Sequence, residues 1–128
     1  MSAELYQIAT REDAVLDTGR IVVLRQSLGD QRCREVVSEV VFHLTDRLGL
    51  LQMALDSGDV ADAQTLASRL ASLSEQVGLK DFARVARDLG HCLGAGDPVA
   101  MAAVAARLMR LGEESLFSVI NYADQSAL

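Results

Sequence analysis

The chain has 128 residues, of which 50% are hydrophobic and 23% are charged, and its formal net charge is −6. This length and composition fit one soluble globular domain, and the negative charge argues against non-specific binding to nucleic acid or to an anionic membrane surface. No apolar stretch approaches the roughly 18 residues that a membrane-spanning helix needs, and the N-terminus lacks the pattern of a signal peptide. We therefore expect a cytoplasmic protein.

The first part of the chain divides into an arm and a short helix. Residues 1–16 show little periodicity and are interpreted as an N-terminal arm, followed by a helical domain over residues 17–128. Asp17 is a good helix cap, and the apolar residues after it recur at helical spacing until Gly29. The sequence therefore predicts a short helix that Gly29 and Asp30 interrupt, and Asp30 is expected to cap the next helix.

Four longer helices are predicted to follow, over residues of about 31–56, 60–77, 80–93 and 98–121. Each carries apolar residues at spacings of three and four, the pattern of a helix with one buried face. Residues that end or start helices separate them, namely Gly58, Asp59, Gly78, Gly94, Ala95, Gly96, Asp97 and Pro98. Because short connections force consecutive helices to lie antiparallel, we expect an all-α fold. The expected architecture is an antiparallel up-down four-helix bundle with an additional short N-terminal helix.

Two features of the helices bear on packing. The predicted inward stripe of the helix over residues 60–77 consists of Val60, Ala63, Ala67, Leu70, Leu73 and Val77. Gly112 lies inside the last helix, where a glycine indicates a close helix crossing or a kink.

Residues 51–89 carry three motifs in succession. The first is a helix end with Leu51, Ala54, Leu55, Gly58 and Asp59, the second is Ala67-Ser68-Arg69-Leu70, and the third is the pair Gly78-Leu79. This order resembles the histidine-containing phosphotransfer (Hpt) domain, whose pattern runs Leu-x-x-Ala-Leu-x-x-Gly-Asp, Ala-His-x-Leu-Lys-Gly and Gly-Leu. The resemblance covers roughly residues 16–120 and implies the helical bundle of that family.

The chemical signature of the family is missing. Ser68 stands where the family has its phospho-accepting histidine, Ala71 stands at its lysine, and Ser72 at its glycine. A serine hydroxyl needs a base before it can attack, and its phosphate ester is too stable to be passed on easily. The resemblance therefore implies a degenerate member that is not an enzyme, and we predict no catalytic residue, no cofactor and no metal site.

What the resemblance retains is a surface for a partner. The predicted partner-binding residues all lie on the predicted helix over residues 60–77 and are Thr65, Ser68, Arg69, Ala71, Ser72 and Glu75. The implied partner is the receiver domain of a response regulator, or a histidine kinase, in two-component phosphorelay signalling. An ordinary solvated helix face is the alternative interpretation of the same residues.

Two further functions stay open. The chain could be an active phosphotransfer protein that uses His43 or His91, or a structural and oligomerisation bundle unrelated to signalling.

Cys33 and Cys92 are interpreted as reduced structural thiols. His91 and Cys92 make a poor metal site because adjacent helical residues point in different directions.

Overall fold

The structure is a computed structural model that describes residues 16–126, and the elements in this range are five α-helices with no strand. They are α2 (Thr18–Leu28), α3 (Asp30–Ser57), α4 (Val60–Gln76), α5 (Lys80–Ala95) and α6 (Pro98–Ser126). The predicted all-α class is confirmed. The predicted arm lies outside the described residues except for Leu16, which is partly buried against the core.

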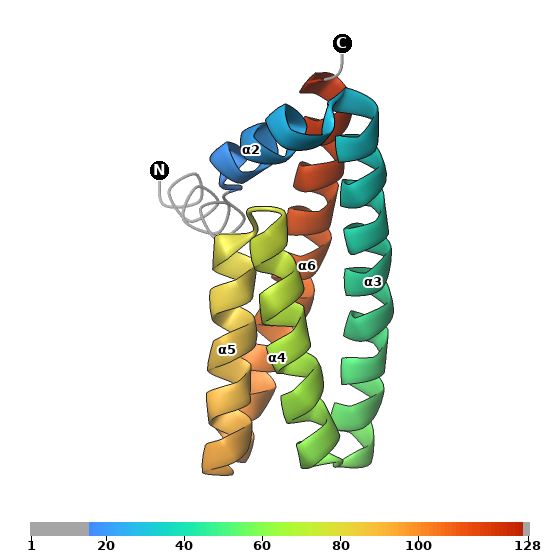
Figure 1. The fold of residues 1–128 in the computed structure, drawn as a ribbon. Helices are drawn as coiled ribbons and strands as arrows, with labels where there is room; N and C mark the ends of the chain where they lie inside the picture. Colours follow the sequence, from blue (N-terminus) through green and yellow to red (C-terminus); the bar gives the residue numbers. More distant parts are fainter. Residues whose placement is uncertain (1–15, 127–128) are drawn as a thin grey trace, which may run out of the picture.

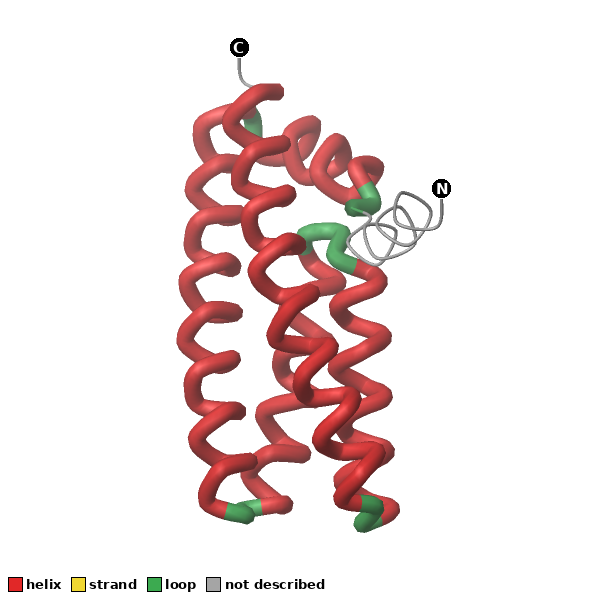
Figure 2. The backbone as a smooth tube through the Cα atoms, turned by 180° about the vertical axis from the view of Figure 1, so that it is seen from behind, coloured by secondary structure: helices red, strands yellow, loops and turns green. Residues whose placement is uncertain are grey.

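The four long helices lie lengthwise beside one another, and α2 lies across the end at which α3 begins (Figure 1). The connections are very short, because only Gly58 and Asp59 separate α3 from α4 and only Gly96 and Asp97 separate α5 from α6. α6 lies behind α4 and α5 in Figure 1 and in front of them in Figure 2, which is the view from behind.

Most helix ends follow the predicted capping chemistry. The Asp59 carboxylate accepts a hydrogen bond from the Asp62 amide at 3.1 Å, and the Asp97 carboxylate accepts from the amides of Val99 and Ala100 at 3.1 and 3.2 Å. These bonds satisfy amides that the first helical turn leaves without a partner. Gly58, with a φ of 75°, closes α3 in the left-handed conformation.

Three boundary predictions are wrong. Asp30 is the first residue of α3 rather than its cap, because the Gly29 carbonyl already accepts the Cys33 amide at 3.0 Å. α5 continues through Gly94 to Ala95, since glycine lowers helix stability without forbidding a helix. α6 extends to Ser126, five residues past the predicted end at 121, because nothing in its last turns breaks a helix.

The core is formed by one face of each helix. Its fully buried large side chains include Ile21, Leu44, Leu51, Leu70, Phe82, Leu89 and Leu108. Burial of one such side chain is worth about 1.5–3 kcal/mol, and the sum offsets the entropy of ordering the chain. Val60 was predicted to point inward, but its side chain is 42% exposed. It is the first residue of α4 and directly follows the connection from α3.

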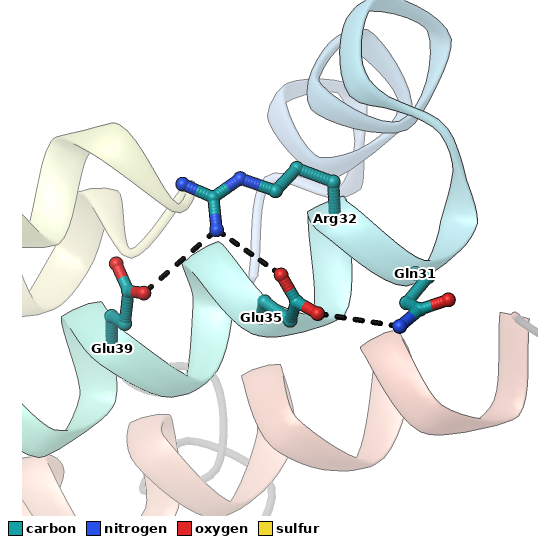
Figure 3. Close-up of polar contacts among 4 residues, drawn as sticks. All are labelled: Gln31, Arg32, Glu35 and Glu39. Carbon is teal, nitrogen blue, oxygen red and sulfur yellow. Dashed lines mark hydrogen bonds and ion pairs between the residues drawn. The ribbon is translucent and has the colours of Figure 1, made fainter.

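A polar network covers the first turns of α3 (Figure 3). Arg32 Nη1 lies 3.1 Å from Glu35 Oε2 and 3.9 Å from Glu39 Oε1, and Gln31 Nε2 donates to Glu35 Oε1 at 3.4 Å. The charged side chains are about half exposed, and such surface pairs contribute less than about 1 kcal/mol each. The network lies on a solvated helix surface, and we assign no function to it.

Candidate docking face on α4 and α5

Ser68 is exposed on α4, as the sequence predicts. Its neighbours Ala67 and Leu70 are completely buried, and they fix the rotation of α4 about its axis. Thr65, Arg69, Ser72 and Glu75 are exposed on the same helix. We call these four residues together with Ser68 the docking face. Five of the six predicted partner-binding residues are therefore accessible to a partner protein.

Ala71 is the exception, and its predicted exposure is wrong. Its side chain is only 2% exposed. Each helical residue advances by about 100°, so the third residue after Ser68 is turned by about 60° from it. That turn carries Ala71 toward α5, where it lines a groove together with Ala86.

A shallow groove of about 280 Å³ runs between α4 and α5 beside Ser68. Its lining comes from both helices and consists of Gln64, Ser68, Ala71, Ser72, Ala86, Arg87, Gly90 and His91. Ala71, Ala86 and Gly90 leave the space because their side chains are small or absent. The groove extends the docking face onto α5.

The α5 contribution to this groove was missed from the sequence. Arg87 and His91 are four residues apart and therefore share one side of α5, which is the only local signal that links them. Which side of α5 faces α4 depends on how the two helices pack. His43, in contrast, is exposed on α3 with its ring edge-on to Phe42 at 5.7 Å between centroids, and it does not line the groove.

Arg87, which lines the groove, forms an ion pair across the two helices. Arg87 Nη2 on α5 donates to Glu75 Oε1 on α4, and both side chains are about half exposed. The pair holds Glu75 and Arg87 against each other across the two helices. As a surface pair it contributes less than about 1 kcal/mol, so a charged partner group can replace either side of it at small cost.

The remaining polar side chains of the groove have no partner within residues 16–126. Gln64, Ser68, Ser72 and His91 make no hydrogen bond or ion pair there. Hydroxyl, amide and imidazole groups can each donate and accept hydrogen bonds. The groove therefore offers a set of unoccupied hydrogen-bonding groups to a polar or anionic group that enters it.

A larger hollow of about 450 Å³ lies at the other end of the bundle, among Leu55, Val60, Pro98, Met101 and Ala105. It is larger than the α4–α5 groove, but its lining is mostly aliphatic. One of its two carboxylates, Asp59, is already used to cap α4. We assign no chemistry to it.

Comparisons of the chain with protein-family models, curated proteins and solved structures find no match. None of the helices in the described range is long and apolar enough to cross a membrane. Residues 16–126 contain no group of three or more His, Cys, Asp or Glu side chains placed to hold a metal ion.

Proposed function

We propose that the chain is an Hpt-like antiparallel up-down four-helix bundle and a binding module of two-component phosphorelay signalling. Its docking face and the adjoining groove bind the receiver domain of a response regulator, or a histidine kinase, in the cytoplasm without carrying phosphate. The observation that carries this proposal is the exposure of Ser68, at the position of the family's histidine, beside the small side chain of Ser72.

The chemistry of the face favours docking over phosphate transfer at Ser68. An imidazole nitrogen is nucleophilic near neutral pH and forms a high-energy phosphoramidate, whereas a serine hydroxyl forms a stable ester. The family's lysine is replaced by Ala71, so no cation from α4 stands there to stabilise a transferring phosphoryl group. Shape and hydrogen-bonding groups remain when the reactive groups are gone.

A bulky charged side chain at Ser72 tests the docking face. Ser72 is exposed, so Ser72→Arg is compatible with the fold, but the longer side chain blocks close approach to α4. We expect the affinity for a receiver or kinase domain to fall about tenfold or more, measured by calorimetry and by chemical-shift mapping of α4 and α5. The matched control is Ser38→Arg, which makes the same change at an exposed serine of α3. Equal affinities for the two variants would rule out the docking face.

His91 supports a second candidate function, because its exposed side chain lines the same groove as Ser68. In that case the neutral ring nitrogen attacks the phosphorus of an aspartyl phosphate on the receiver. The bond from phosphorus to the aspartyl oxygen breaks, the carboxylate leaves, and a phosphoramidate forms on His91. Gln64 and Ser68 would donate hydrogen bonds to the phosphoryl oxygens.

Incubation with a ³²P-labelled receiver separates the two candidates. Docking without transfer leaves no label on the chain. Transfer through His91 puts label on the wild type and on His43→Ala but not on His91→Ala. The His43→Ala variant is the matched control because His43 is also an exposed histidine but lies outside the groove. Label that is lost only in His43→Ala would contradict both assignments.

A further inference from the structure

Helix α2 buries less of itself than the other helices do. It has 11 residues, too few for an isolated helix to be stable in water, and the run Ile21-Val22-Val23 has low helix propensity. Of its residues, all of which the structure describes, Ile21 alone is buried, and Leu24 is partly buried against the core. In contrast, α3, α4 and α5 each bury six or more residues. The helical form of α2 therefore depends on a small contact with the bundle.

Polar contacts hold the start of α2 against the connection between α4 and α5 (Figure 1). The Asp17 amide donates to the Gly78 carbonyl at 2.8 Å, and the Asp17 carboxylate lies 3.0 Å from Lys80 Nζ. Arg20 Nε donates to the Gln76 carbonyl at 3.1 Å. The side chains of Asp17, Arg20 and Lys80 are at least partly exposed, so water can replace their contacts at small cost.

At its other end α2 joins α3 through the single residue Gly29. Gly29 has a φ of 83°, a conformation that glycine adopts without strain, and a Cβ added there would meet nothing within 4 Å. Arg25 tethers this end, because it lies 3.4 Å from Asp30 and 6.0 Å from the centre of the Tyr122 ring. These contacts are about one helical turn from Gly29 and can persist while the start of α2 moves.

The thiol of Cys33 lies under α2. Its side chain is 1% exposed, and its Sγ is 3.9 Å from the Ile21 carbonyl oxygen. We propose that α2 is a hinged strap that turns about Gly29, releases the α4–α5 connection and uncovers Cys33 while α3 to α6 stay folded. Elements with few buried contacts open at a lower free energy than the whole molecule unfolds. The strap controls access to this end of the bundle, and Cys33 reports its opening.

The urea dependence of thiol labelling tests the strap in the wild type. N-ethylmaleimide is added at urea concentrations below the unfolding midpoint, and mass spectrometry follows the labelling of Cys33. We expect a much weaker urea dependence than that of global unfolding, because opening of one short helix exposes little surface. Cys33 labelling that follows the full urea dependence of global unfolding at every concentration overturns the inference.

Two glycine substitutions test the contact between α2 and the α4–α5 connection. A Cβ added to Gly78 would overlap the Asp17 carbonyl oxygen, whereas one added to Gly58 would meet nothing within 4 Å. Both glycines have a positive φ, 82° and 75°, so alanine strains the two backbones similarly. We expect Gly78→Ala to speed Cys33 labelling about tenfold or more at low urea, and Gly58→Ala to leave it unchanged. Equal acceleration in both variants contradicts the strap.

A milder pair of variants serves if Gly78→Ala does not fold. Arg20→Met removes the hydrogen bond to Gln76, and we expect Cys33 labelling to rise about two- to fivefold. Arg47→Met is the matched control, because Arg47 Nη1 donates to the His43 carbonyl at 3.5 Å within α3. Equal Cys33 labelling rates in these two variants overturn the inference. The inference does not rest on phosphorelay function, which the Ser72→Arg experiment tests separately.

Discussion

Asp17 joins three parts of the chain at the start of α2. Its carboxylate accepts the Gly19 amide at 3.1 Å and lies 3.0 Å from Lys80 Nζ at the start of α5, and its own amide donates to the Gly78 carbonyl at 2.8 Å. The hydrogen bond and the charge of Lys80 hold the pKa of Asp17 below its ordinary value of 3.8. A lowered pKa in the folded state means that ionised Asp17 stabilises the fold.

That stabilisation depends on pH with a definite sign. It is fully present above the ordinary pKa of 3.8 and is lost as the pH falls through the lower pKa of the folded state. Asp17→Asn keeps a capping oxygen but removes the charge. We therefore expect the variant to unfold at lower urea than the wild type at pH 7, with the difference closing as the pH falls through the lowered pKa of Asp17 in the folded state.

Lys80→Gln is the matched control, because it removes the other half of the pair. It should show the same loss at pH 7 and the same convergence in acid. A difference in urea midpoint between wild type and Asp17→Asn that stayed constant from pH 7 to pH 2 would contradict the assigned pKa shift.

At the scale of an element, two glycines inside helices differ in the space available for a side chain. A Cβ added to Gly49 in α3 would meet nothing within 4 Å, whereas one added to Gly112 in α6 would lie 3.0 Å from Leu48 Cδ1 and 3.2 Å from Phe82 Cε1. The close crossing that Gly112 indicated in the sequence is therefore present, between α6 and the side chains of α3 and α5.

Alanine substitution converts this difference into a stability measurement. Gly49→Ala should stabilise the protein by about 0.5–1 kcal/mol, because alanine is the better helix former and nothing obstructs it. Gly112→Ala has the same propensity benefit but must push Leu48 and Phe82 aside, so we expect it to be less stable than Gly49→Ala by about 1–3 kcal/mol. Urea unfolding of both variants measures the difference in free energy of unfolding. Equal values would show that the helix crossing at position 112 accommodates a methyl group.

At the scale of the whole molecule, the proposed docking face belongs to α4 and α5, and α6 lies behind these two helices (Figure 1). The docking face can be removed by substitution of exposed residues alone, which leaves the shared core intact.

Much of the candidate site could be predicted because helix rotation is a local property. The alternation of Ala67 and Leu70 with polar residues was enough to predict that Ser68 faces solvent. The same reasoning placed Ala71 wrongly, since a residue 60° from the centre of a face is exposed or buried according to how near the next helix lies. His91 was named only as a possible phospho-acceptor, and the position of Arg87 and His91 in the groove was missed because they belong to another helix.

The sequence by itself determined the helices and the direction of their apolar faces, because hydrogen bonding, capping and periodicity act over a few neighbouring residues. Only the tertiary structure decided what meets across those faces. It set Gly78, with a φ of 82°, against the backbone of Asp17, and it brought His91 into the groove beside Ser68. Those contacts depend on the relative rotation and height of separate helices, which are set by the packing of all the side chains between them.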